Sequence, residues 1–128
     1  MYTTNYTDTF IAIAEDSPVD HAEIPAEKDP KTVARIEYEM LVDAPYRYTS
    51  DDVLYAANGE RRGLSRDEFF AKGQACFRAS PLAKRYGWGV HSDAEGRIAI
   101  YAAGSPEYMA MFADPALKQL KAMRSSRR

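Results

Sequence analysis

The chain has 128 residues, of which 45% are hydrophobic and 12% aromatic, and it has one cysteine. This length suits one domain, and this composition excludes an intrinsically disordered chain. The formal net charge of −2 conceals an asymmetry, because residues 1–60 hold 13 acids and 4 bases whereas residues 61–128 hold 6 acids and 13 bases.

Opposite charges on the two halves predict mutual attraction inside one compact domain over residues 1–128. A second interpretation is a basic face for a phosphate-bearing partner, and head-to-tail pairing in a homodimer is a third. We expect residues 1–7 and 124–128 to be flexible. The longest apolar run, 98–103, is too short for the ~20 residues of a membrane span. The N-terminus lacks secretion-signal features, and one cysteine allows no internal disulfide. We therefore expect a cytoplasmic protein without membrane contact.

The first predicted element is a strand over Thr9–Ala14, a mixed run of β-branched and apolar residues that we expect to be buried on at least one face. Residues 17–30 are acidic and interrupted by proline, which predicts an exposed loop. A helix is expected to follow Asp29-Pro30 and to end near Asp43, because apolar residues recur there at helical spacing, namely Val33, Ile36, Met40 and Leu41.

Two capping-box patterns come next, Thr49 with Asp52 and Ser65 with Glu68. The first predicts a helix ended by Gly63. The pair Asn58-Gly59 within it is also a strong hairpin signal, so residues 51–62 stay open between helix and hairpin. The second box predicts a short helix that ends near residue 73.

Proline follows Ser or Asp in five places, a pattern typical of a helix cap and first turn. The pairs begin at residues 17, 29, 80, 105 and 114, and we expect four of them to open helices. Trp88–His91 and Arg97–Ala102 flank a turn-forming loop and predict an antiparallel hairpin. A basic C-terminal helix is expected after residue 113. These elements predict an α+β fold, a small antiparallel sheet of about three strands with four or five helices packed on it.

Catalytic and cofactor motifs are scarce. Three Cys and His residues in total, Cys76, His21 and His91, are too few for a zinc site, so we expect no metal. The chain contains no phosphate-binding GKS or GKT loop and no GxSxG motif, and we expect no cofactor. Cys76 has Arg78 nearby and His91 as a candidate base, but a buried and inert cysteine is the competing interpretation. Its reactivity stays open.

The most concentrated candidate site lies between residues 78 and 97. A helix that opens at Pro81 would present free N–H groups, and several cations could converge there on a phosphate or carboxylate, with an aromatic ring as a stacking surface. The candidate binding residues are Arg78, Ser80, Lys84, Arg85, Trp88, His91 and Arg97. The competing interpretation is a short solvated helix with Trp88 in the core.

Four strings of the chain, KTVARIEYEML, YTSDDVL, FRASPLAKRYGWGVH and LKQLKAMRS, resemble an uncharacterised family of small microbial proteins that is classed as a domain of unknown function. The resemblance runs from about Asp8 to Arg124. It implies a self-contained cytosolic protein and no known activity, cofactor or catalytic residue. The C-terminal hairpin followed by Ser105-Pro106-Glu107 also resembles YjbR-type small α/β proteins.

Three functions follow as hypotheses. The first is a non-enzymatic domain that binds an anionic small molecule or a phosphorylated partner at the residue 78–97 site. The second is a thiol-dependent enzyme or redox sensor that uses Cys76. The third is weak nucleic-acid binding through the basic C-terminal helix, although we consider nucleic acid an unlikely partner.

Overall fold

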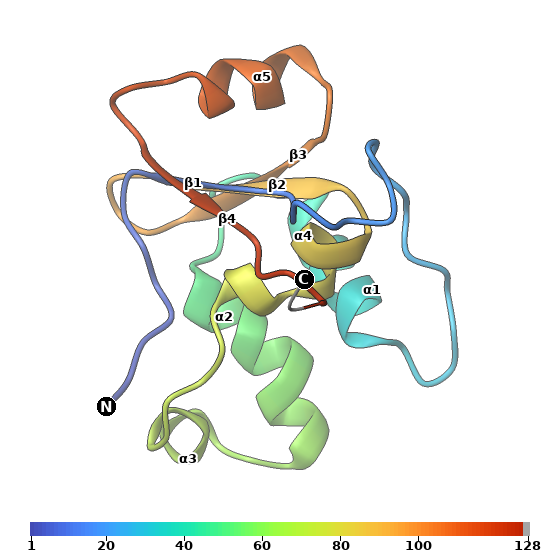
Figure 1. The fold of residues 1–128 in the computed structure, drawn as a ribbon. Coiled ribbons are helices and arrows are strands. Elements are labelled where there is room, and N and C mark those ends of the chain that lie inside the picture. The colour runs from blue at the N-terminus through green and yellow to red at the C-terminus, as the bar shows by residue number, and fades with distance from the viewer. Residues whose placement is uncertain (127–128) are drawn as a thin grey trace.

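The chain folds around a four-stranded sheet with the strand order β3-β2-β1-β4 (Figure 1). The structure is a computed structural model and describes residues 1–126. Strand β1 (Thr9–Ala12) pairs antiparallel with β2 (Trp88–Ser92), and β2 pairs antiparallel with β3 (Ile98–Ala102). Strand β4 (Lys118–Lys121) pairs with β1 in parallel. The α+β class is thereby confirmed, with four strands in place of about three.

Helices cover both faces of this sheet. Helix α5 (Pro106–Phe112) lies alone on one face, and α1 (Val33–Leu41), α2 (Ser50–Leu54) and α4 (Pro81–Arg85) lie on the other (Figure 1). Helix α3 (Arg66–Phe70) lies farther from the sheet. Alternation along a strand explains the two layers, since successive side chains point to opposite faces and each face buries its own apolar set.

Strand β4 corrects the expectation of a basic C-terminal helix, which is wrong. The segment lacks β-branched residues and carries two exposed lysines, so no local pattern favours a strand. It becomes one because its backbone pairs with the exposed edge of β1, beginning with Lys118 N and Asp8 O at 2.8 Å. The sheet is consequently mixed instead of purely antiparallel.

Capping residues set the helix starts as the sequence predicts in most places. Thr49 and Ser65 each form a complete capping box. Helix α2 continues through a π-helix, η1 (Tyr55–Gly59), and a 3-10 turn, η2 (Glu60–Arg62), to a left-handed Gly63 with φ of 71°. Residues 51–62 are therefore helical, and the hairpin alternative is wrong.

Only two of the Ser-Pro and Asp-Pro pairs open helices, fewer than the four expected. Ser80 and Ser105 cap α4 and α5 with proline at the first helical position. Helix α1 begins later than Asp29-Pro30 because Thr32 is its cap and accepts a hydrogen bond from Arg35 N. The pairs at residues 17 and 114 lie outside helices. Proline after a polar residue is thus compatible with a turn as well as a helix start.

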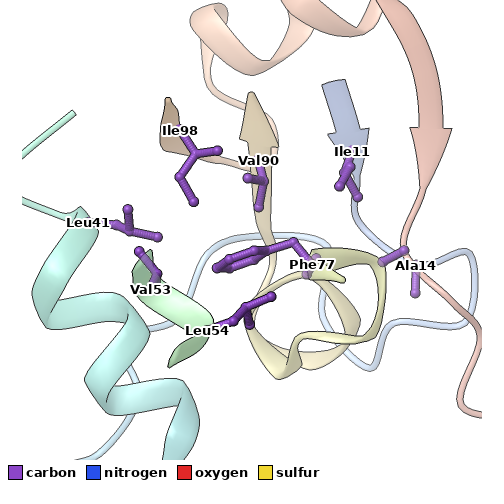
Figure 2. Packing of buried hydrophobic residues seen from close by; sticks show 10 residues of the cluster. Ile11, Ala14, Leu41, Val53, Leu54, Phe77, Val90 and Ile98 are labelled. Carbon is purple, nitrogen blue, oxygen red and sulfur yellow. The ribbon is translucent and has the colours of Figure 1, made fainter. Parts of the chain in front are cut away.

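The larger apolar core lies between the sheet and the helices α1, α2 and α4. Figure 2 shows Phe77 at its centre, between Val90 and Ile98 on the strands and Leu54 on α2. Phe77 belongs to the 3-10 turn η3 (Phe77–Ala79) and is 1% exposed. On the opposite face, Phe10 packs edge-on against Tyr108 of α5, with the ring centroids 5.1 Å apart. Both faces of the sheet are therefore closed by side chains.

The N-terminal segment is tied to α2 by polar contacts. Thr4 is buried, and its N and Oγ1 donate to Asp51 Oδ1, both at 2.7 Å. At the other end, the backbone N atoms of Ser125 and Ser126 donate to Asp16. Flexibility of residues 1–7 and 124–126 stays a prediction, and residues 127 and 128 lie outside the described part. Among residues 1–126, no helix has both the length and the apolar character needed to cross a membrane.

Candidate functional site

The residues predicted to form an anion site lie in separate parts of the fold. Lys84 and Arg85 end helix α4, just before β2 begins. Arg97 precedes β3 and so lies beyond the far end of β2, since Ser92 pairs with Ile98. Five strand residues span roughly 13 Å from first to last. Arg97 is therefore about a strand length from α4 and does not share a hollow with Lys84 and Arg85.

Two of the predicted cations are already engaged with backbone oxygens. Arg97 Nη1 donates to Arg47 O at 2.6 Å, and Arg78 Nε donates to Lys121 O at 2.8 Å. The Arg78 contact joins the turn η3 to strand β4. Both guanidinium groups thus stabilise the positions of loops and strand ends through hydrogen bonds to the backbone, a structural role that requires no ligand.

Trp88 is also held by a backbone contact. Its Nε1 donates to Glu23 O at 2.8 Å, and its ring lies 5.7 Å from that of Tyr38, centroid to centroid, at a tilt of 55°. The indole is half-buried and fastens the acidic loop of residues 17–30 to the sheet. Its contacts are those of a packing residue.

His91 lies on the face of the sheet that carries α5, in a network of aromatic side chains that sequence reasoning missed. Its Nδ1 is 2.7 Å from the hydroxyl of Tyr46, and this hydroxyl is 2.7 Å from that of Tyr101. Partial burial lowers the pKa of His91, while the nearby acids Asp93 and Asp8 oppose this shift. Tyr46 has a left-handed backbone with φ of 61°, an uncommon conformation for a residue other than glycine. The network indicates a hydrogen-bonded structural histidine.

Ser80 leads to a different site, because its hydroxyl points to a buried carboxyl group. Ser80 Oγ accepts from Leu82 N at 3.2 Å and donates to Glu37 Oε1 at 2.7 Å. The helix start that was expected to present free N–H groups is therefore capped by Ser80, which is itself buried with 4% of its surface exposed. Glu37 belongs to α1, so this contact joins the two helices on one face of the sheet.

Glu37 is the most unusual ionisable residue of the described chain. Its side chain is fully buried, and its second carboxyl oxygen, Oε2, has no hydrogen-bond partner among residues 1–126. Burial raises its pKa from 4.5 to about 7, although the hydrogen bond from Ser80 acts in the opposite direction. A buried polar atom without a partner costs about 1–3 kcal/mol, and most such atoms in native proteins are paired. A hydrogen-bond donor bound next to Oε2 would therefore remove this cost.

Glu37 borders a pocket of about 120 Å³ between α1, α2 and the segment that leads to α4. Apolar side chains from each of these elements form most of its wall. Its polar members besides Glu37 are Ser80, Asn58 and Cys76, and the complete lining is Val33, Glu37, Leu54, Asn58, Ala75, Cys76, Ala79, Ser80 and Pro81. Asn58 donates through Nδ2 to Leu54 O at 3.2 Å, so the acceptor Oδ1 of its amide is the atom left for a ligand.

Cys76 lies at this pocket with its thiol half-buried. Its Sγ is 3.4 Å from the hydroxyl of Tyr6, a contact that raises the pKa of the tyrosine. Arg78, two residues away, acts on the same hydroxyl in the opposite direction. The predicted pairing of Cys76 with His91 has no support here, because the His91 nitrogen contact goes to Tyr46.

A larger hollow of about 420 Å³ is a weaker candidate. One continuous stretch of chain, residues 13–21, supplies its whole lining, so it is the concave side of a loop. Its ionisable side chains include Glu15, Asp20 and His21, all exposed. Within residues 1–126, no three His, Cys, Asp or Glu side chains are placed to hold a metal ion. The smaller pocket is preferred because its lining includes Glu37, whose buried Oε2 has no hydrogen-bond partner in the described part of the chain.

The burial of Glu37 could have been predicted from the sequence, because the helical spacing of apolar residues places it on the apolar face of its helix. The buried face of α1 consists of Ala34, Glu37 and Leu41, with Glu37 three residues after Ala34 and four residues before Leu41. A carboxylate on the apolar stripe of an amphipathic helix is an exception to the usual pattern, and such exceptions mark buried polar sites. What the sequence could not provide was the opposing wall, which comes from residues 54–81.

Comparison with known proteins places the chain in a family without giving it an activity. Neither the curated proteins nor the solved structures searched gave a match. A family model does match, and it covers residues 1–128. This agrees with the family resemblance in the sequence. The chain belongs to the family of unknown function DUF6157.

Proposed function

We propose that the chain is a non-enzymatic domain that binds a small molecule in the Glu37 pocket. The observation that carries this proposal is that Glu37, whose buried Oε2 has no hydrogen-bond partner among residues 1–126, is one of the residues that line a cavity. A ligand that donates a hydrogen bond to this oxygen would relieve the penalty of leaving it unpaired. Typical pockets that enclose a whole drug-sized ligand measure ~300–1,000 Å³, so this one suits a very small molecule or the end group of a larger one.

The ligand chemistry differs from that suggested by the sequence. An anion in this pocket would meet the carboxyl of Glu37, and among the residues that the structure describes no lysine or arginine lines the pocket to balance it. Anion binding by Arg78, Lys84 or Arg85 elsewhere on the surface stays a prediction, as do the cytoplasmic location, a homodimer and nucleic-acid binding by the basic C-terminal segment. Loss of heparin retention after removal of the residues that follow Met123 would support the last of these.

Ligand-induced thermal stabilisation tests the proposal. A library of small amines, amides, alcohols and carboxylates is added to the natural chain, to Glu37→Gln and to Glu39→Gln. Glu39 is on the same helix but forms ion pairs with Lys31 and Arg35 at the surface, so it is the matched control. We expect at least one compound to stabilise the natural chain and Glu39→Gln but not Glu37→Gln. A library without any stabilising compound contradicts the proposal.

A thiol-dependent function is the second candidate, because Cys76 lines the same pocket. A catalytic thiol would have to ionise near neutral pH, since the thiolate is the nucleophile. Labelling with iodoacetamide across pH 5–10 measures that ionisation. Rapid labelling with a midpoint below pH 7 would favour this candidate, whereas slow labelling of the native chain would exclude it. A ligand that slows labelling would also place its binding beside Cys76.

A further inference from the structure

Within the described part of the chain, the lining of the Glu37 pocket includes hydrogen-bond acceptors and one side chain that can carry a formal charge near neutral pH, the acid Glu37. The acceptor groups belong to two lining residues, namely the buried carboxyl of Glu37, whose Oε2 has no partner among residues 1–126, and the amide of Asn58, whose Nδ2 is already bonded. Ser80 Oγ has its proton committed to Glu37 and accepts from Leu82 N, so it offers no donor. An acceptor-rich and negatively charged lining is complementary to a ligand that carries several N–H donors and a positive charge.

We infer that the Glu37 pocket recognises a small primary ammonium ion, held through Glu37 Oε2 and Asn58 Oδ1, an inference that rests on the proposed binding function. A primary ammonium group carries three N–H donors and no acceptor, so it can serve both oxygens at once. A hydrogen bond to a carboxylate from a charged donor is roughly twice as strong as one between neutral groups.

The walls of the pocket limit the rest of the ligand to a short alkyl chain. Val33, Leu54, Ala75 and Pro81 supply carbon surface around the polar end. The volume of about 120 Å³ equals that of roughly four water molecules at ~30 Å³ each, which matches an ammonium group with two or three carbons. A larger amine would have to leave its remaining atoms outside the mouth.

Binding of an ammonium ion requires Glu37 to be ionised, so affinity should depend on pH. Ser80, which is in direct contact with Glu37, does not titrate in this range, and among residues 1–126 Cys76 is the other titratable residue of the pocket lining. With the Glu37 pKa at about 7, the ionised fraction is roughly one tenth at pH 6 and nine tenths at pH 8. The apparent Kd is the intrinsic Kd divided by this fraction, so it should be about tenfold lower at pH 8.

Titration with three matched probes tests the inference. Propylammonium chloride, 1-propanol and sodium propionate have similar size and differ in charge and donor number. Each is titrated into the ¹⁵N-labelled chain at pH 6 and pH 8 while amide chemical shifts are recorded, and the series is repeated with Glu37→Gln and Glu39→Gln. We expect propylammonium to shift the amides of Glu37, Asn58 and Ser80, more tightly at pH 8, and to lose this effect only in Glu37→Gln.

The outcomes separate the inference from the proposed function. Binding of propanol or propionate at these amides with propylammonium no tighter would overturn the ammonium ligand and leave the pocket as a binding site. Absence of binding by all three probes, together with a library that stabilises nothing, would overturn both. Should Glu37→Gln fail to fold, the natural chain at the two pH values decides, because equal propylammonium affinity at pH 6 and pH 8 contradicts a role for ionised Glu37.

Discussion

Replacement of Glu37 by glutamine should remove a pH dependence of stability that the natural chain carries. In the folded state burial raises the pKa of Glu37 to about 7, whereas an unfolded glutamate titrates near 4.5. Between these values the folded chain binds more protons than the unfolded chain. Stability from this group is therefore fully present below about pH 4.5 and is lost as the pH rises through 7.

The magnitude follows from the pKa shift. A rise from 4.5 to about 7 corresponds to about 3 kcal/mol of unfolding free energy above pH 7, and most of this loss falls between pH 5 and pH 8. Glutamine has nearly the same shape and stays neutral. Its amide N–H₂ would replace Oε2 as an unpaired buried group, which costs about 1–3 kcal/mol at every pH. This cost of the glutamine side chain is therefore the same at every pH, and the change in unfolding free energy with pH is the quantity that reports the titration of Glu37.

Urea unfolding at pH 5, 6, 7 and 8, followed by circular dichroism, measures this slope. The free-energy difference between the variant and the natural chain cancels the titration of His21 and His91, which both chains retain. We expect Glu37→Gln to gain about 2–3 kcal/mol relative to the natural chain from pH 5 to pH 8. Glu39→Gln serves as control, because its ion pairs lower the pKa of Glu39 and place its titration below this range. Parallel curves for Glu37→Gln and the natural chain would refute the reasoning.

Two further substitutions test the packing around the site. Ser80→Ala removes both the cap of α4 and the hydrogen bond to Glu37, so it should lower the free energy of unfolding, measured in urea, by about 2–3 kcal/mol. Ser105→Ala removes only a cap and should cost about 1 kcal/mol. Equal losses in the two variants would mean that the hydrogen bond to Glu37 contributes nothing to stability. Gly89→Ala would place its Cβ 2.6 Å from the Phe10 ring and should cost about 1–3 kcal/mol, whereas a Cβ at Gly73 has its nearest neighbour at 3.7 Å and Gly73→Ala should be nearly neutral by the same assay. A stable Gly89→Ala would show that the β2 face against α5 is loosely packed.

Local signals in the sequence account for most of the elements. The capping boxes at Thr49 and Ser65 and the left-handed Gly63 fix their helix ends through side-chain and backbone bonds within a few residues. The hairpin of β2 and β3 likewise depends on a turn between them. Such elements are predictable because the groups that stabilise them are close in sequence.

The parts that sequence reasoning missed depend on contacts between distant residues. Strand β4 exists because Lys118–Lys121 pairs with Thr9–Ala12, more than a hundred residues earlier. The pocket exists because Ser80 and Glu37 meet across 43 residues. Ser80 was predicted to lie beside cations, whereas its hydroxyl donates a hydrogen bond to the carboxyl group of Glu37. Clustering of cations along the chain gave no information on this partner.

The carboxyl carbon of Glu37 provides the most direct measurement, because its ¹³C chemical shift reports protonation of the group itself. A pH titration of the labelled chain should give a midpoint near 7, and addition of propylammonium should lower it, since a bound cation favours the ionised form. A midpoint near 4.5 that propylammonium leaves unchanged would contradict the account, in which Glu37 is buried without a partner for Oε2 and binds a small ammonium ion.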